Sequence, residues 1–384
     1  MTTVVKARCH CGLNSFNIPF ATASLPITND LCHCTSCQHS TGQLMVNHVA
    51  FLGAPLSGSA ATDSNEPADL STLTPYKTSA SATRWFCSRC SAHILWEYNN
   101  TTHPSWCVAV GTLERTEGIV KTGYHIWVAD TLDGGIADHL RVVDGLELPR
   151  YIAGVKECEV VPAKWRSADI LEDSRAHSQE LDRILAYCHC RAISFWITRP
   201  SAASAQPSSP YPDLMHPYIS TPKDKVANPN DEKWWLRPGV VNSTHYLAGH
   251  CACTSCRLTS GFEIQSWAFI PKANLLFPRP GAAPATTELI ELNLQDDDLR
   301  PAGLRRYRSS AGRNREFCGT CGATVFWWGE ERPELVDVAV GLVDEKVGGS
   351  RAEGWFEWWR GRVSFEEDAV NKGLVQGLVE GLRA

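Results

Sequence analysis

The chain has 384 residues, of which 43% are apolar, and it carries a formal net charge of −6 with a pI near 6.1. A chain of this length can bury two or three cores without cross-links, and its ordinary composition excludes general disorder and fibrous repeats. The acidic balance argues against a nucleic-acid surface, so we expect a small-molecule partner and no nucleic acid.

The sequence contains no run of 18 apolar residues, and its first residues, Met-Thr-Thr-Val-Val-Lys, lack the apolar core of a secretory signal. We therefore expect a cytoplasmic location and no membrane partner. The one basic run comprises Arg305, Arg306, Arg308, Arg313 and Arg315. A solvated loop and an anion-binding segment both fit this run, and the acids at 296–298 favour the loop.

The first half opens with Cys9-His10-Cys11-Gly12, followed by an alternating run that is typical of a strand leaving a metal-binding turn. Cys32-His33-Cys34-Thr35-Ser36-Cys37 comes next. Residues 44–52 predict a buried strand, and residues 53–82, rich in Gly, Pro, Ser and Thr, predict an irregular surface segment.

A second turn, Cys87-x-x-Cys90, leads directly into a predicted strand, and residues 106–113 predict another. Tyr124 to Val128 then lead to the turn-rich stretch 130–135, which we interpret as a substrate loop. We place the first domain at 1–165, a charged connector with a short helix at 166–185, and the second domain at 186–384.

The second half repeats the order of parts, with Cys188-His189-Cys190, then Cys251-Ala252-Cys253-Thr254-Ser255-Cys256, then Cys318-x-x-Cys321. A long insertion at 198–245 has no clear periodicity and indicates either a lid or a surface segment. At the place of the loop 125–135, the second half has Trp355, Trp358 and Trp359, which could line a pocket or belong to the core.

Sixteen cysteines could form a disulfide scaffold, but the tight Cys-x-Cys and Cys-x-x-Cys spacings and the chain length favour metal thiolates. Two sets of four predict closed, structural zinc sites, because zinc with four thiolates has no vacant position. These sets are Cys9, Cys11, Cys87 and Cys90 in the first half, and Cys188, Cys190, Cys318 and Cys321 in the second.

Two sets of three remain: Cys32, Cys34 and Cys37, and Cys251, Cys253 and Cys256. Each predicts a zinc ion with an open fourth position, so we expect up to two zinc ions per domain. Three thiolates blunt the acidity of zinc toward water and suit the activation of an exogenous thiol. The alternative is a structural site completed by Cys107 or His33.

His125 and His33 are the candidate catalytic residues. His125 precedes Trp127 and Asp130 and could act as an acid or base. His33 lies between two predicted ligands and could orient one of them. A packed histidine on a strand, or a purely structural one in a metal-binding turn, fits the same positions.

These cysteine groups, with Gly42, Phe86 and their counterparts at Gly261 and Phe317, resemble the family of glutathione-dependent formaldehyde-activating enzymes, which includes the domain of centromere protein V. The two copies of the pattern cover nearly the whole chain. The resemblance implies a mainly β fold made of two tandem Mss4-like zinc-binding domains. It also implies that the three-cysteine zinc is the active one and that glutathione adds to formaldehyde.

We therefore expect a zinc-dependent carbon–sulfur lyase in which a thiol such as glutathione meets a small carbonyl compound, with the first half as the working site. Two alternatives stay open. One is a zinc-dependent lyase or hydrolase that acts on a larger metabolite in a biosynthetic pathway, because the insertions at 53–82, 198–245 and 279–313 are where substrate choice would reside. The other is a non-catalytic zinc module that binds a protein or ligand.

Overall fold

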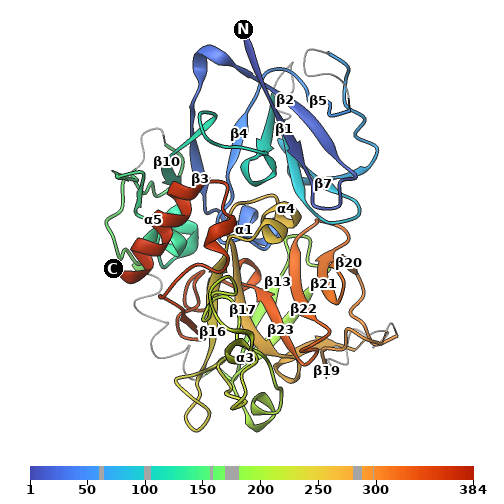
Figure 1. Ribbon diagram of the computed structural model, residues 1–384, viewed down its shortest axis with the longest axis vertical. Helices are drawn as coiled ribbons and strands as arrows, with labels where there is room; N and C mark the ends of the chain where they lie inside the picture. The colour runs from blue at the N-terminus through green and yellow to red at the C-terminus, as the bar shows by residue number, and fades with distance from the viewer. Residues whose placement is uncertain (60–64, 99–104, 156–158, 169–180, 280–287, 297) are drawn as a thin grey trace.

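The computed structural model describes residues 1–59, 65–98, 105–155, 159–168, 181–279, 288–296 and 298–384. The fold is mainly β, as predicted, and its strands gather in two lobes (Figure 1). The blue and cyan lobe holds the sheets of the first half of the chain, and the yellow and orange lobe holds those of the second. Helices α1 (Thr35–Thr41) and α4 (Thr254–Ser260) both lie where the lobes meet.

In its described residues, the first half contains three sheets and a short β-hairpin. The largest is antiparallel, with the strand order β4-β9-β8-β7-β6. Its strands are β4 (His48–Ala50), β6 (Leu73–Ser79), β7 (Ala82–Cys87), β8 (His93–Tyr98) and β9 (Ser105–Ala109). The second sheet is formed by β1 (Thr2–Arg8), β2 (Ser15–Ala21) and β5 (Leu56–Ser57), and the third pairs β3 (Ile27–Cys32) in parallel with β10 (Val120–Ile126).

The second half is built on the same plan, but more of its strands join in one main sheet. Its main sheet has the order β15-β16-β17-β23-β22-β21-β20, with β24 paired to β16. These strands are β15 (Leu236–Arg237), β16 (His245–Cys251), β17 (Gln265–Pro271), β20 (Leu304–Ser310), β21 (Arg313–Cys318), β22 (Thr324–Gly329), β23 (Leu335–Ala339) and β24 (Phe356–Trp358). A four-stranded sheet contains β13 (Arg183–Tyr187), β14 (Ser194–Thr198), β18 (Leu275–Pro278) and β19 (Leu289–Glu291).

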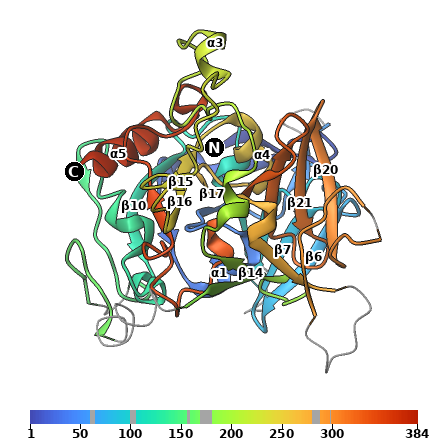
Figure 2. The same ribbon diagram turned by 90° about the horizontal axis from the view of Figure 1, so that it is seen from below.

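Smaller elements complete the chain. The hairpin of β11 (Val142–Val143) and β12 (Leu146–Glu147) belongs to the first half, and α3 (Lys223–Val226) and α5 (Lys372–Arg383) belong to the second. Seen from below, the α3 segment of the insertion stands out from the body of the protein (Figure 2). None of the described helices has the length and the apolar character that crossing a lipid bilayer requires.

Three sequence predictions need correction. Part of the stretch 53–82 is the strand β6, which accepts Pro75 because it lies at the edge of its sheet. Of the predicted strand 44–52, the structure assigns His48–Ala50 to a strand, and Val46 forms an isolated bridge with Cys32. The basic run is a β20–β21 hairpin rather than a solvated loop, and Arg300 and Arg306 pair with the fully buried Glu316 at 2.9 and 2.7 Å. The predicted connector helix falls mostly in 169–180, outside the described residues.

The two halves bind each other through reciprocal histidine contacts. His10, between two cysteines of the first half, forms hydrogen bonds with Tyr307 (2.8 Å) and Ser255 (3.2 Å) of the second half. His189, its counterpart, forms hydrogen bonds with Tyr76 (2.6 Å) and Ser36 (3.2 Å) of the first half. The metal-binding turn of each half is thus tied to the three-cysteine loop of the other.

The helix α5 fastens the end of the chain to the first half. Its Gly373, Gly377 and Gly381 repeat every four residues and so share one face. A Cβ atom at Gly377 would lie 2.0 Å from the carbonyl oxygen of Val142, and one at Gly381 would lie 1.8 Å from that of His139. Because glycine costs about 1 kcal/mol in a helix, this stripe is explained by the close approach of two backbones.

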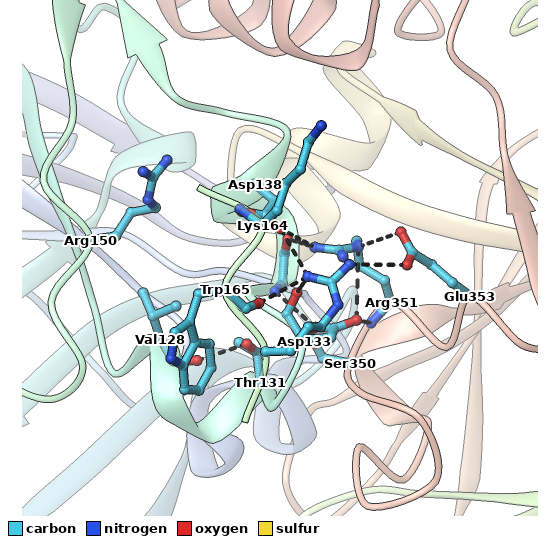
Figure 3. A network of polar contacts seen from close by, with 12 residues as sticks. Val128, Thr131, Asp133, Asp138, Arg150, Lys164, Trp165, Ser350, Arg351 and Glu353 are labelled. Carbon is cyan, nitrogen blue, oxygen red and sulfur yellow. Dashed lines mark hydrogen bonds and ion pairs between the residues drawn. The ribbon is translucent and has the colours of Figure 1, made fainter. Parts of the chain in front are cut away.

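A buried ionic network joins the halves at the segment that we predicted to be a substrate loop. Figure 3 shows Arg351 of the second half among Asp133, Asp138 and Glu353. The backbone N–H of Arg351 donates to Asp133 at 3.0 Å, and its guanidinium donates to Glu353 at 3.0 Å. Arg351 is 1% exposed and Asp133 is 2% exposed. Residues 133–135 therefore serve the contact between the halves.

We predict that Arg351→Met lowers the free energy of unfolding by about 3–5 kcal/mol, because it leaves the buried carboxylate of Asp133 without its cation. The double variant Arg351→Met/Asp133→Asn should recover part of this loss, since the unpaired buried charge is gone. Urea denaturation measures both effects. A single variant as stable as the wild type would show that the network does not hold the halves together.

We also predict that Gly42→Ala is far more destabilising than Gly145→Ala. Both glycines have the left-handed backbone, with φ of +77° and +76°, so the cost of that conformation, about 1–2 kcal/mol, is matched. A Cβ atom at Gly42 would lie 2.2 Å from the carbonyl oxygen of Thr324 in the other half, whereas Gly145 has nothing within 4 Å. Thermal unfolding should separate the variants by several degrees, and equal midpoints would contradict the tight contact.

Candidate metal centres and their cavities

Each predicted set of four cysteines comes together in space. Cys9 and Cys11 follow β1, and Cys87 and Cys90 flank the turn between β7 and β8. All four sulfur atoms lie within 4.8 Å of one another, with Sγ–Sγ distances of 3.5 Å for Cys9–Cys11 and 3.6 Å for Cys11–Cys87. The second half repeats this group with Cys188, Cys190, Cys318 and Cys321.

Each predicted set of three also comes together, at the start of a short helix. The first cysteine ends a strand, the second is the N-cap residue, and the third lies in the first turn. The N-cap sulfur accepts a hydrogen bond from the third residue's backbone N–H, at 3.3 Å for Cys34 and 3.2 Å for Cys253. In the described part of the chain, neither group includes a fourth His, Cys, Asp or Glu ligand atom, so neither Cys107 nor His33 completes the first group.

The sulfur spacing fits a tetrahedral ion. Thiolates about 2.3 Å from zinc lie roughly 3.8 Å apart, whereas disulfide sulfurs lie about 2.05 Å apart. The hydrogen-bonded sulfur pairs of the closed groups lie 3.5–3.6 Å apart, and all described cysteines are free thiols. The four groups are therefore compatible with zinc: two closed sites and two with an open position.

Sequence reasoning missed an arginine at each open group. Arg84 on β7 donates from Nη2 to the sulfur of Cys37 at 2.9 Å, and Arg315 on β21 approaches the sulfur of Cys256 at 3.5 Å. Hydrogen bonds from Cys32 and Cys34, and then the charge of Arg84, hold the pKa of Cys37 well below its ordinary value. Each arginine begins an Arg-x-Phe-Cys pattern just before the second metal-binding turn of its half. This repeated pattern is the feature of the sequence that could have identified them.

The first open group faces a cavity of about 590 Å³. Its walls carry Asp30 and Asn29 from β3, His48 from β4, Trp96 from β8 and Asp130 from the loop after β10. Burial raises the pKa of Asp30 to about 6. Burial and the neighbouring Arg84 hold the pKa of His48 well below its usual range, so this imidazole is neutral at pH 7.

The second open group faces a smaller cavity of about 230 Å³, and part of its wall comes from the insertion 198–245. The two cavities place their acids differently. Gly249 lies two residues before the first cysteine of its group, the position that Asp30 occupies in the first half. Asp337 occupies the same position in the strand pairing of the second half as Cys107 does in the first. Burial also raises the pKa of Asp337 to about 6.

The structure places the predicted catalytic histidines away from the cavity. His33 and His125 are both fully buried, their rings are hydrogen-bonded at 2.8 Å, and neither lines the first cavity. The backbone N–H of His33 donates to the carbonyl oxygen of Ile126, and the backbone N–H of Ala252 donates to that of Ser364 in the same way. Ala252 therefore corresponds to His33, and Val363, which precedes Ser364, corresponds to His125, which precedes Ile126. An apolar pair can thus replace the histidine pair, which favours a positioning role.

The same alignment corrects the predicted counterpart of the loop after β10. Trp127 corresponds to Phe365, and both have a left-handed backbone. Asp130 and Asp368 accept hydrogen bonds from the first helical N–H of α1 and α4, at 3.0 and 3.4 Å. The predicted tryptophans Trp355, Trp358 and Trp359 line neither open-group cavity, and Trp355 is fully buried.

We predict that Arg84→Gln weakens zinc binding at the first open group by roughly 10–100-fold, because the cation next to Cys37 is lost. Arg315→Gln is the matched control and should have a smaller effect, since its guanidinium lies farther from the sulfur. Competition with a chelator, followed by counting the zinc ions retained, measures both. Wild-type retention in Arg84→Gln would show that this arginine does not support the site.

Comparison with known proteins agrees with this geometry. Residues 4–130 match the family model described as "Glutathione-dependent formaldehyde-activating enzyme". Searches of curated proteins and of solved structures returned no match. The matched stretch contains both cysteine groups of the first half and the strands that carry them. The resemblance to the family of glutathione-dependent formaldehyde-activating enzymes is therefore shown for residues 4–130.

Proposed function

We propose that the first half is a zinc-dependent enzyme that forms or breaks a carbon–sulfur bond, with a thiol such as glutathione and a small carbonyl compound as reactants. The observation that carries the proposal is the open group of Cys32, Cys34 and Cys37 facing a cavity of about 590 Å³. A site completed by the protein would have no room for a reactant. We also propose that residues 186–384 form a second domain of the same kind.

The reaction is an addition that needs no oxidant or reductant. The thiol loses its proton, its sulfur forms a bond to the carbonyl carbon, and the carbonyl oxygen takes up a proton. Zinc held by the three cysteines would supply a Lewis acid that lowers the pKa of the reacting thiol. The reverse sequence breaks the same carbon–sulfur bond.

The residues of the cavity wall supply the remaining functions. Asp30 is the carboxyl group best placed to carry the proton from the thiol to the oxygen, because it lies on β3 two residues before Cys32 and lines the cavity. Arg84 balances the negative charge of the thiolates. His33 and His125, buried beneath the cysteine loop, hold the loop in position.

An amide in the wall supports glutathione as the thiol. Asn29 is 4% exposed and lines the cavity, and among the described residues neither atom of its side-chain amide has a hydrogen-bond partner. A buried amide without partners is costly, and a peptide group can satisfy its donor and its acceptor together. Glutathione presents two such groups.

We predict that Cys34→Ser reduces the glutathione-dependent consumption of formaldehyde to the uncatalysed rate and lowers the zinc content by one ion per chain. Cys253→Ser is the matched control, because it makes the same change at the N-cap of α4, and it should retain most of the activity. Nuclear magnetic resonance of the product and elemental analysis measure the two quantities.

Two results would count against the proposal. A Cys34→Ser protein that stays folded, loses the metal and keeps its full rate would exclude catalysis at this group. A wild-type protein that holds zinc but shows no glutathione-dependent turnover would favour a non-catalytic zinc module or another substrate.

A further inference from the structure

The cavity of the second half differs from that of the first in the chemistry of its wall. Six aromatic side chains line it: Tyr218, Trp234, Trp267, Phe269, Trp327 and Phe365. Tyr218 and Trp234 come from the insertion 198–245, and the others come from β17, β22 and the loop after β24. Trp267 stands where the first half has His48, so the repeated strand has exchanged an imidazole for an indole.

The aromatic rings are held in place by contacts within the protein. Trp234 packs edge-to-face on Phe269 with ring centroids 5.0 Å apart, and its indole N–H donates to the carbonyl oxygen of Pro210 at 3.1 Å. Tyr218 packs edge-to-face on Phe365 at 5.6 Å. Since the indole of Trp234 already has its hydrogen bond, its ring offers the cavity an apolar surface.

The insertion is a fixed wall rather than a loose segment at this point. The buried carboxylate of Asp213 accepts hydrogen bonds from the backbone N–H of Phe365 at 2.6 Å, from Arg362 at 3.1 Å and from Ser364 at 3.2 Å. Leu214 packs where Gly249 lacks a side chain, and a Cβ atom there would lie 2.4 Å from Leu214. Glycine at position 249, where the first half has Asp30, thus leaves the space that Leu214 of the insertion fills.

Some buried polar atoms of this cavity lack a hydrogen-bond partner among the described residues, and one of them belongs to Arg332. Arg332 is 7% exposed and lies over the ring of Trp327, with its guanidinium carbon 4.7 Å from the ring centroid. Its Nη2 donates to Asp337 at 2.7 Å, but its buried Nη1 has no hydrogen-bond partner among the described residues. A buried donor without an acceptor is unfavourable, and an oxygen atom of a ligand would satisfy it.

The other charged groups of the wall are already paired. Arg313 pairs with Glu331, Asp213 is bound by Arg362, and Arg315 lies on the sulfur of Cys256. A zwitterionic peptide such as glutathione would need several free charges here, whereas the buried nitrogen atoms without a hydrogen-bond partner in the described wall are Nη1 of Arg332, Nε of Arg315 and Nε2 of His250. The wall therefore matches a largely apolar ligand that carries an acceptor oxygen.

We propose that the second cavity binds a flat aromatic molecule of one or two rings that carries a carbonyl or carboxylate oxygen. The rings lie against the tryptophans, and the oxygen accepts the hydrogen bond of Arg332, next to the open position beside Cys251, Cys253 and Cys256. The inference concerns binding alone, so it does not depend on the reaction proposed for the first half.

Isothermal titration calorimetry of the full chain with 2-naphthoate and with 2-acetylnaphthalene tests the proposal, in the absence of glutathione and formaldehyde. We expect one molecule bound per chain. Trp327→Ala should weaken binding by about tenfold or more, while Trp96→Ala, the same change at the matching position of the first cavity, should leave it unchanged. Arg332→Gln should weaken the binding of both probes while zinc content and the unfolding temperature show that the protein remains folded.

Three outcomes would overturn the proposal. They are no binding of either probe to the wild type, an equal loss in Trp96→Ala and Trp327→Ala, and equal binding of cyclohexanecarboxylate, which has the oxygen but not the aromatic ring. None of these outcomes bears on formaldehyde consumption in the first half, so failure of this proposal and failure of the proposed function can be told apart.

Discussion

The grouping of four thiols in each half is the constraint on which the rest of the structure depends. A Cys-x-Cys turn that must place both sulfur atoms on one tetrahedral ion has little conformational freedom, so the residue between them is aimed outward from the site. In this chain that residue is His10 or His189, and it reaches the three-cysteine loop of the opposite half through Ser255 or Ser36. The closed group of one half therefore helps to position the open group of the other.

This arrangement explains why the halves could diverge in their cavities but not at their contact. At the contact, Gly42 and Gly261 each approach a backbone carbonyl of the other half, so a change on one side requires a change on the other. Inside the cavities, a change in one half does not require a matching change in the other. There Asp30 has given way to Gly249 and Cys107 to Asp337, so each cavity has a carboxyl group whose pKa is raised by burial but receives it from a different strand.

Local spacing made the cysteine groups predictable from the sequence, because Cys-x-Cys and Cys-x-x-Cys leave few geometries for the sulfur atoms. The alternating runs beside these turns predicted individual strands, and the resemblance to the family implied the mainly β fold. The strand β6 was missed because Pro75, Lys77 and Thr78 lack the apolar alternation of a buried strand, and an edge strand does not need it. The stripe of glycines in α5 was missed because its reason lies in the backbone of a segment more than 200 residues away.

The side chains that surround the candidate site are brought together by pairing between distant strands, and the sequence alone did not reveal this pairing. His125 stood beside an acid and an aromatic residue in the sequence, but β10 pairs in parallel with β3 and turns this side chain toward His33 inside the protein. Arg84 looked like one more charged residue before a metal-binding turn, yet the pairing of β7 with β8 aims it at Cys37. A parallel pair brings residues of one face together however far apart they lie in the chain, so the groups that surround a metal centre follow from strand register more than from neighbourhood in the sequence.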